Sequence, residues 1–362
     1  MKLLHTADWQ IGMEASRCGA AAERVRAARI ESARLLAQLA AREKVDFTLL
    51  AGDTFENHGV SGADVEAVAA ILGGFPCPVF VLPGNHDPDA PGSVWEHPAW
   101  RLRSNVTLLR QAQPVAAPGC VLFPCPLRTR WGQADPTSWI PAGAAPGSIR
   151  IGAAHGALAN LPGAASDHPI AADAATRHRL DYLALGHFHS TRIYNSPDGR
   201  PSMAYSGTHE PTAFGEDDSG NALLVEIDAP STAPRLQSIR TALLDWRQLR
   251  HTIDQPHLLA GIRRQVEDLV SSTRLLDLRL DGILFAEDQE HLDAIGALAH
   301  RFLHARVDSS ELLPPVTLDD LPEGPVRETA RRLLALCDNP AQSPAARLAL
   351  QRILRLARGV SA

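Results

Sequence analysis

Short apolar runs alternate with longer amphipathic stretches along the first part of the chain. Residues 23–41 and 63–72 carry apolar side chains at helical spacing, and they predict two helices. Short apolar runs at 2–7, 45–50 and 79–82 predict buried strands. Such strand–helix–strand alternation is typical of an α/β domain, in which functional loops lie at the carboxyl ends of the strands.

The middle of the chain predicts further strands of the same domain. Apolar runs at 149–154, 182–185 and 222–227 are separated by segments rich in Pro and Gly, and we expect them to complete the same system of sheets. The sequence Ala-Pro-Ser-Thr-Ala-Pro at 229–234 is typical of a linker. The first domain is therefore predicted to span residues 1–230.

The second half predicts a smaller α+β domain over residues 235–315 and a helical segment over 320–362. The helical segment holds two amphipathic patterns, at 326–337 and 344–358. The elements expected in the smaller domain are 236–244, 257–270, 275–280 and 288–303.

Short polar motifs follow the apolar runs of the first domain. Because the carboxyl ends of neighbouring strands meet at one edge of a sheet, we expect these motifs to converge in one cleft. Carboxylate oxygen, amide oxygen and imidazole nitrogen together suit divalent ions such as manganese, iron or zinc. The motifs are Asp8-Trp9-Gln10, Gly52-Asp53, Gly84-Asn85-His86-Asp87, His155-Gly156 and Gly186-His187-Phe188-His189.

In this order the motifs resemble those of the calcineurin-like metallophosphoesterases, whose pattern is D-x-H, G-D, G-N-H-D, a single His and G-H-x-H. The resemblance covers residues 1–228 and is closest to the SbcD-type DNA repair exonucleases, including the YhaO branch. It implies an α/β fold: a two-sheet metallophosphoesterase sandwich flanked by helices, with a small α+β capping domain and a C-terminal helical segment. The resemblance to the SbcD-type nucleases in particular rests on residues 5–9, 51–57, 82–87 and 205–210.

The same resemblance implies a site for two divalent metal ions. Asp53 would bridge the ions, with Asp8 and His189 on one side and Asn85, His155 and His187 on the other. Manganese is the favoured ion, and Mg²⁺, Fe²⁺ and Zn²⁺ are alternatives. His86 would be the catalytic residue beside the scissile phosphate, protonating the leaving oxygen or stabilising its charge.

Gln10 departs from this pattern, because it stands where the family has the histidine of D-x-H. Its amide oxygen could bind a metal ion, but a neutral amide is a weaker ligand than imidazole for a transition metal. A hydrogen bond to one of the ligands is an equally open interpretation of Gln10. His209 and Glu210 also lie in a segment similar to the nucleases, and they could serve only the structure of the loop.

Composition narrows the choice of function. The chain has 362 residues, 45% of them apolar, which is ordinary for a folded protein. The net charge of −6 gives no overall cationic field for nucleic acids, so a DNA substrate would depend on bound cations and local arginines. The five cysteines form no C-x-x-C pair, and no apolar run reaches 18 residues. These features predict reduced thiols, a cytoplasmic protein and no contact with membranes.

Three functions remain open at this point. The first is a metal-dependent phosphodiesterase that acts as an exonuclease or endonuclease at DNA ends in DNA repair, with an SMC-like ATPase as partner and a homodimer as a further option. The C-terminal helical segment would then bind the ATPase. The second is a phosphodiesterase or phosphatase acting on nucleotides or other small phosphoesters. The third is a non-catalytic scaffold for DNA ends or the ATPase, inactive because of Gln10.

Overall fold

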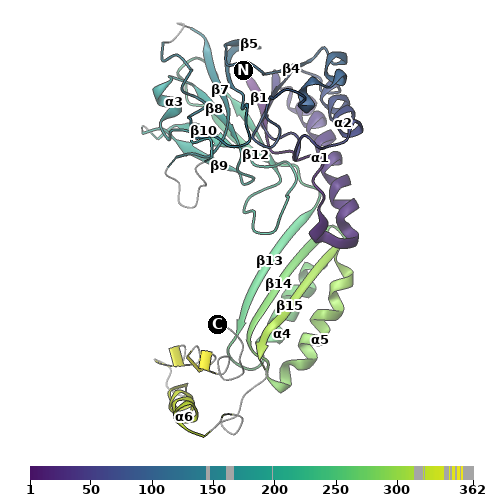
Figure 1. Ribbon diagram of the computed structural model, residues 1–362, viewed down its shortest axis with the longest axis vertical. Helices are drawn as coiled ribbons and strands as arrows, with labels where there is room; N and C mark the ends of the chain where they lie inside the picture. Colours follow the sequence, from purple (N-terminus) through teal and green to yellow (C-terminus); the bar gives the residue numbers. More distant parts are fainter. Residues whose placement is uncertain are drawn as a thin grey trace. The chain divides into compact units, whose positions relative to one another are not determined.

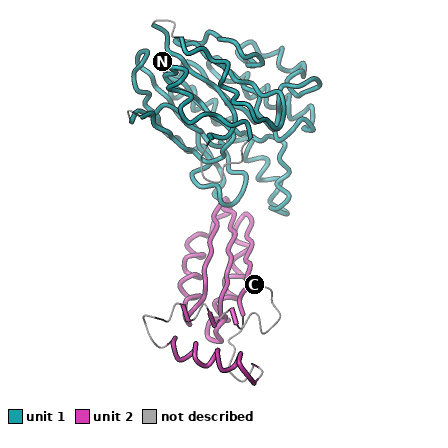
Figure 2. The backbone as a smooth tube through the Cα atoms, turned by 60° about the vertical axis from the view of Figure 1, so that its left-hand side comes forward, with its two compact units in different colours: residues 1–245 teal, residues 246–362 magenta. Residues whose placement is uncertain are grey.

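The computed structural model describes residues 1–143, 147–159, 167–197, 199–313 and 323–337, together with 321, 342, 345–346, 349–350 and 352–353. The chain divides into two compact units, Met1–Asp245 and Trp246–Ala362 (Figure 2). Each unit has its own sheet structure and is described separately below.

Unit 1 contains two six-stranded sheets (Figure 1). The first sheet has the strand order β12-β11-β1-β2-β3-β4, and the second has the order β5-β6-β7-β8-β10-β9. The strands of the first sheet are β1 (Lys2–Thr6), β2 (Phe47–Ala51), β3 (Val79–Leu82), β4 (Val106–Leu108), β11 (Asn221–Glu226) and β12 (Arg235–Arg240). Those of the second are β5 (Val115–Ala117), β6 (Cys120–Cys125), β7 (Ile149–His155), β8 (Tyr182–Gly186), β9 (Arg192–Asn195) and β10 (Pro201–Tyr205).

The two sheets pack face to face. Side chains alternate along a strand, so that Leu3 points into the cluster between the sheets while Leu4 points into the cluster beneath the helices. In the inter-sheet cluster, Phe47 and Leu49 of the first sheet meet Ile151 of the second. This arrangement confirms the predicted two-sheet sandwich.

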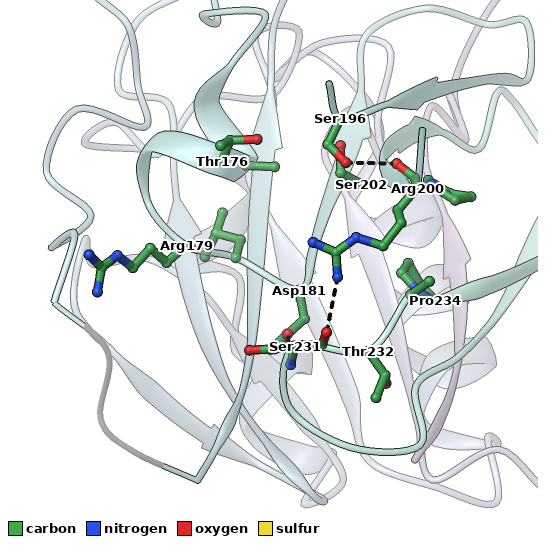
Figure 3. Close-up of a pocket in the computed structure, with 13 residues that line it drawn as sticks. Thr176, Arg179, Asp181, Ser196, Arg200, Ser202, Ser231, Thr232 and Pro234 are labelled. Carbon is green, nitrogen blue, oxygen red and sulfur yellow. Dashed lines mark hydrogen bonds between the residues drawn. The ribbon is translucent and has the colours of Figure 1, made fainter. Parts of the chain in front are cut away.

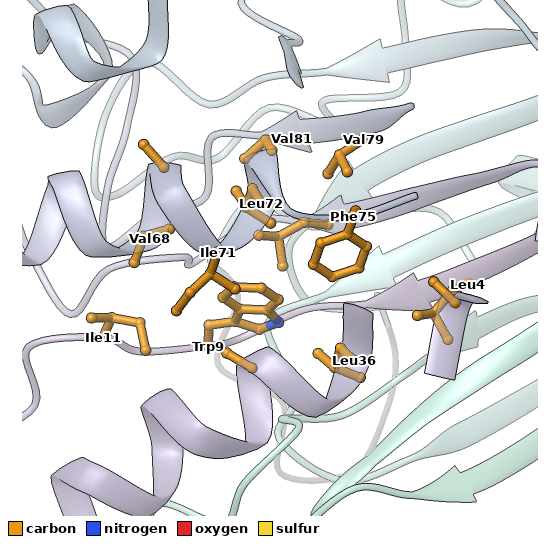
Figure 4. Packing of buried hydrophobic residues seen from close by; sticks show 14 of the residues in the cluster. Leu4, Trp9, Ile11, Leu36, Val68, Ile71, Leu72, Phe75, Val79 and Val81 are labelled. Carbon is orange, nitrogen blue, oxygen red and sulfur yellow. The ribbon is translucent and has the colours of Figure 1, made fainter. Parts of the chain in front are cut away.

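Two helices cover the outer face of the first sheet. They are α1 (Ala22–Glu43) and α2 (Gly62–Gly73), and their apolar faces pack with Trp9 and Leu4 in one buried cluster (Figure 4). Ser61 caps the N-terminus of α2: its side chain accepts a hydrogen bond from the Asp64 backbone N–H, and the Asp64 carboxylate accepts one from Ser61 N–H. The short helix α3 (Ala174–Arg177) contributes Ala174 and Ala175 to the outer cluster of the second sheet.

The domain boundary expected at 230–235 differs from the division at Asp245. Strand β12 pairs along its whole length with β11 and therefore belongs to the first sheet. The predicted linker 229–234 is also tied to unit 1: Ser231 N–H donates to Asp181 Oδ1 (2.5 Å), and Arg200 Nη1 donates to the Ser231 carbonyl (3.0 Å). These residues line a cavity of about 280 Å³ beside the first residues of β8 and β10 (Figure 3).

Unit 2 has a three-stranded sheet and two packed helices. The strand order is β13-β14-β15, and Leu276 and Leu278 of β14 share a buried cluster with Leu259 and Ile295 of the helices. The helix pattern at 326–337 is confirmed as α6 (Pro325–Cys337), whereas most of the pattern at 344–358 lies outside the described residues. The other elements are β13 (Asp245–Ile253), α4 (Leu258–Leu269), β14 (Arg274–Ile283), α5 (Gln289–Leu298) and β15 (His304–Leu313).

Within the described part of the chain, no helix combines the length and the apolar character needed to cross a lipid bilayer.

Candidate metal centre

The predicted ligands follow the carboxyl ends of strands in both sheets. Strands β1, β2 and β3 run parallel in the first sheet, so the loops that begin with Asp8, Asp53 and Asn85 leave the same edge. Strands β7 and β8 run parallel in the second sheet and bring His155 and His187 to the corresponding edge. The two edges together gather residues from positions 8 to 189 into one site.

Several of these residues have strained backbones. Asp8 and Asp53 have φ angles of 53° and 51°, and His187 has a φ of 116°. L-residues rarely adopt positive φ, and such strain persists where the surrounding contacts fix it, often at functional sites. Two of these contacts are visible here, because Asp8 N–H donates to the Gly52 carbonyl and His187 N–H donates to both Asp8 carboxylate oxygens.

Three buried side chains form the centre of the site. One ligand atom from each of Asp8, Asp53 and His155 lies within 4.8 Å of the others. Asp8 and His155 are fully buried, and Asp53 is 2% exposed. Two buried carboxylates this close are unfavourable without a compensating positive charge, so the set fits a divalent cation.

The ionisation of these groups also fits a cation site. Burial raises the pKa of Asp8 to about 6. Burial opposes the ionisation of Asp53 as well, but His155 and His86 hold its pKa below the usual range. Burial alone would lower the pKa of His155, and the charge and hydrogen bond of Asp53 instead raise it to about 9. A bound metal ion would replace the proton of His155 as the partner of Asp53, so metal binding should strengthen as the pH rises.

Asn85 and His187 complete one side of the centre. The Asn85 Oδ1 atom lies 2.9 Å from His155 Nε2 and 3.3 Å from His187 Nδ1. His155 Nδ1 lies 2.9 Å from the Ala51 carbonyl, which can only accept, so Nδ1 carries a proton and Nε2 is the atom that faces the site. Burial and the nearby charge of His155 lower the pKa of His187 to about 3, which leaves a neutral imidazole suited to metal binding.

Gln10 lies inside the site, but its side chain donates a hydrogen bond to a ligand where the family pattern has a metal-binding histidine. Its Nε2 donates a hydrogen bond to Asp53 Oδ2 (3.0 Å). Its Oε1 is buried and has no hydrogen-bond partner within the described residues. A buried carbonyl oxygen without a partner costs free energy, and a metal ion or a water molecule beside it would remove that cost.

His86 lies at the rim of the centre. Its backbone N–H donates to Asp53 Oδ1 (2.9 Å), which fixes the loop against the candidate bridging carboxylate. The ring Nδ1 is 2.9 Å from the Glu56 carbonyl oxygen and 3.8 Å from a Glu56 carboxylate oxygen. The side chain is 27% exposed, so its ring remains accessible to a substrate.

Two glycines allow the backbone to approach these ligands. A Cβ atom on Gly84 would lie 2.2 Å from Asp53 Oδ1 and 2.3 Å from the Asp53 backbone nitrogen. On Gly52, which has a φ of +97°, it would lie 2.1 Å from His155 Nδ1. Both glycines are therefore required by close packing against a ligand.

Asp87 supports the loops without facing the centre. Its carboxylate accepts hydrogen bonds from the backbone N–H groups of Gly84 (2.7 Å) and Phe55 (2.9 Å). The sequence motif indicates only that Asp87 lies close to the ligands along the chain. In the structure, its hydrogen bonds join the loop after β3 to the loop after β2. Burial, together with the charge of Asp53, raises the pKa of Asp87 to about 7.

His189 is oriented by a carboxylate that no sequence motif indicates. His189 Nδ1 lies 2.7 Å from Glu216 Oε1 and 2.9 Å from Thr212 Oγ1. Because a carboxylate can only accept, Nδ1 carries a proton and Nε2 is free to bind a metal ion. Burial lowers the pKa of His189, but the hydrogen bond and charge of Glu216 raise it overall. No local signal marks Glu216, since it stands 27 residues from its partner.

Glu216→Gln should weaken metal binding on the His189 side by about 10- to 100-fold, the usual effect of losing a partner that orients a metal-binding histidine. Calorimetric titration with Mn²⁺ measures this directly. Asp217→Asn is the matched control, because this exposed neighbour loses the same charge without a contact to His189. Equal Mn²⁺ affinity in the two variants would contradict the role of Glu216.

Comparisons with known proteins place the first part of the chain in a described family. A family model described as calcineurin-like phosphoesterase matches residues 1–191. The chain is similar to the crystal structure of TT1561 of Thermus thermophilus, with 13% identity, 66% of this chain and 98% of that chain covered, and a TM-score of 0.43. It is also similar to a double mutant of Vps29 from Entamoeba histolytica, with 10% identity, the same two coverages and a TM-score of 0.31. No curated protein matches the chain.

Proposed function

The chain belongs to the calcineurin-like phosphoesterase family, whose members are metal-dependent phosphoesterases, and from this premise we propose that it hydrolyses phosphodiester bonds at DNA ends. The observation that carries the chemistry is the convergence of Asp8, Asp53 and His155 within 4.8 Å at the carboxyl edge of two sheets. The motif resemblance to SbcD-type nucleases supports DNA as the substrate.

The proposed ligands divide into two groups around Asp53. Asn85, His155 and His187 would hold one ion with Asp53, and Asp8 and His189 would hold the second with Gln10 nearby. When bound, divalent ions supply Lewis-acid stabilisation of the phosphoryl charge and make a water molecule more acidic. The contribution of the protein is to keep the ligands deprotonated, fixed in orientation and buried.

His86 is proposed to act on the leaving group. The Glu56 carbonyl oxygen holds Nδ1 of its ring, and the hydrogen bond from its backbone to Asp53 keeps the ring beside the metal centre. The side chain is 27% exposed, so the imidazole can reach the leaving oxygen and donate a proton to it. His86 would therefore be a general acid and not a ligand.

We also propose that α6 contributes to binding an SMC-like ATPase, as the resemblance to the SbcD-type nucleases implies. Val326, Leu334 and Leu336 of this helix are 39–42% exposed, although they are large apolar side chains. Such a helix is suited to the groove of a partner protein. Deletion of residues 325–337 should abolish co-purification with the ATPase while leaving hydrolysis of a small diester intact.

The proposed activity is tested by incubating the full chain with Mn²⁺ or Mg²⁺ and end-labelled single- and double-stranded DNA, beside a bis-aryl phosphodiester. Cleavage of DNA that is absent from an Asp53→Asn variant would support the nuclease. Cleavage of the small diester alone would replace DNA with a small phosphoester as the substrate class. Failure to cleave either substrate, with DNA binding retained, would favour the scaffold.

The scaffold is kept as a second candidate because of one observation. Gln10 directs an N–H group at Asp53 Oδ2, so the proposed bridging carboxylate shares this oxygen with an amide. The metal ion on the Asp8 side would then be weakly held, and turnover could require a partner or be lost.

Gln10→His should raise Mn²⁺ affinity on the Asp8 side by about tenfold or more, because imidazole is a stronger ligand than a neutral amide for this class of ion. Metal content after dialysis and calorimetric titration measure the change. Gln38→His, on the exposed side of α1, is the control for adding a histidine. If Gln10→His binds no more metal than this control, Gln10 is not what weakens the site.

A further inference from the structure

The loop of residues 128–132 is fixed to a buried pair of residues. Gly132 N–H donates to Asp167 Oδ1 (2.9 Å), and His168 N–H donates to the Gly132 carbonyl (2.8 Å). His168 Nε2 lies 3.1 Å from the Thr129 carbonyl. Asp167 and His168 are each only 6% exposed, so the loop has a rigid base although its tip is exposed.

The same buried carboxylate connects this loop to the metal centre. Asp167 Oδ1 holds Gly132, and Asp167 Oδ2 accepts a hydrogen bond from Asn85 Nδ2 (3.4 Å). Asn85 Oδ1 in turn faces His155 and His187. A single side chain, that of Asp167, therefore links the loop backbone at Gly132 to the proposed metal ligand Asn85.

The residue before Gly132 is Trp131, whose side chain is 70% exposed. The Arg130 guanidinium carbon lies 5.7 Å from the centre of the Trp131 ring, at the distance of a cation–π contact. Arg130 has no hydrogen bond or ion pair within the described residues. The face of the indole ring and the N–H groups of the guanidinium are therefore both accessible to a ligand.

The other two arginines of this region are held by carboxylates. Arg110 and Arg128 both bind the buried carboxylate of Asp89, at 2.7 Å and 2.6 Å. Arg110 also lies 3.9 Å from Glu96, so Arg110 and Arg128 are both paired with carboxylates, whereas Arg130 is not, within the described part of the chain. Arg130 is therefore the arginine of this loop that can meet a phosphate group, although the net charge of the chain is −6.

We propose that Trp131 and Arg130 bind an unpaired nucleobase of a DNA end, next to the phosphodiester that is cleaved. This inference rests on the proposed function and makes its substrate more specific. An aromatic ring stacks on any base, and the guanidinium can contact both the base face and the backbone phosphate. The bases of an intact duplex are already stacked, so the loop favours single-stranded or frayed ends.

The test compares the wild type, Trp131→Ala and Trp131→Phe with Mn²⁺ and a single-stranded oligonucleotide. The same oligonucleotide is also supplied with an abasic nucleotide at each position near the cleaved bond. For the wild type, the oligonucleotide that lacks the stacked base should have a KM about tenfold higher than that of the intact oligonucleotide. The other abasic positions should have little effect. Trp131→Ala should show this increase with the intact oligonucleotide and no further increase with the abasic one, and Trp131→Phe should recover most of the loss. Leu102→Ala, at another exposed apolar side chain, is the control.

Equal cleavage of intact DNA by the wild type and Trp131→Ala would overturn the stacking proposal and leave the nuclease intact. A penalty in Trp131→Ala that is the same for intact and abasic DNA would also overturn it, because the tryptophan would then act without a base. Absence of DNA cleavage by the wild type, with hydrolysis of the bis-aryl diester retained, would remove the proposed function and this inference together. Loss of both activities in Trp131→Ala but not in Leu102→Ala would show that Trp131 serves the metal centre and does not bind a base.

Discussion

Asp53→Asn should lower phosphodiester hydrolysis by at least about a thousandfold. Loss of an outer partner of a metal ligand typically costs 10- to 100-fold, and loss of the central ligand should cost more. Asp53 is the carboxylate around which the site is organised. It lies 3.3 Å from His155 Nε2 and accepts hydrogen bonds from Gln10 and from the His86 backbone. An asparagine would keep the shape but remove the charge.

Two measurements separate loss of the metal centre from loss of the fold. Metal content after dialysis in Mn²⁺ should fall. Without metal, the variant should still unfold cooperatively but at a lower temperature, because the carboxylate that pairs with the buried His155 is lost. Asp173→Asn is the matched control, since this exposed carboxylate only pairs with Arg177 on the surface. Full activity in Asp53→Asn would contradict the assignment of the metal centre.

The centre of the site could be predicted from the sequence because its signals are local. Asp8, Asp53, Asn85 and His155 each follow or end an apolar run that forms a buried strand. Parallel strands place their carboxyl ends at one edge, so the order of the motifs was enough to bring the residues together. The glycines beside them are explained by the same geometry, as shown by the close approach of Gly84 to Asp53.

The supporting residues could not be predicted, because they act across long separations in the sequence. Glu216 reaches His189 from a loop with no apolar pattern, and Asp167 reaches Asn85 from 82 residues away. A carboxylate in a loop is usually a solvated surface group, so nothing in the sequence distinguishes these two from their neighbours. Their roles follow only from the hydrogen bonds of the folded chain.

The end of unit 1 at Asp245 could not be predicted for a related reason. The composition of 229–234 is that of a linker, yet Asp181 and Arg200 bind this segment by hydrogen bonds. Strand β12 is an edge strand with a mostly exposed pattern, and therefore lacks the apolar run that marked its neighbours. Strands β13 and β15 are likewise only partly buried, so no apolar run marks them, and the pattern at 236–244 predicts an element of the smaller domain instead.

The segment 208–210 illustrates a motif whose role is structural. His209 is buried, its Nε2 donates to the Arg29 backbone carbonyl (2.8 Å), and its ring lies 5.2 Å from that of Trp9. Burial and the charge of Arg29 lower the pKa of His209 to about 3, so it is neutral. The segment therefore joins α1 to the loop that carries Asp8, and the likeness of this region to the nucleases reflects packing behind the site.

Arg29→Met should destabilise unit 1 by about 3 kcal/mol, the scale expected when a buried charged donor is removed and its partners are left behind. Arg29 is 1% exposed. Both of its terminal nitrogens donate to the Glu210 carbonyl (2.6 Å), and Nη2 also reaches Thr208 Oγ1 (3.2 Å). Burial lowers the pKa of Arg29 to about 10, and the carboxylates of Glu210, Glu216, Glu56 and Asp8 counteract this effect.

Methionine would fill much of the space of the arginine stem but leave the Glu210 carbonyl without a donor and the surrounding carboxylates without their cation. For a unit of this size, a loss of about 3 kcal/mol corresponds to a fall of roughly 6–12 °C in the unfolding temperature.

Arg34→Met, on the exposed face of the same helix, is the control and should change the unfolding temperature little. Equal unfolding temperatures for the two variants would show that the carboxylates behind the metal centre do not depend on Arg29. A fall confined to Arg29→Met would show that the buried guanidinium of helix α1 stabilises the segment 208–210, which packs behind the loop that carries Asp8.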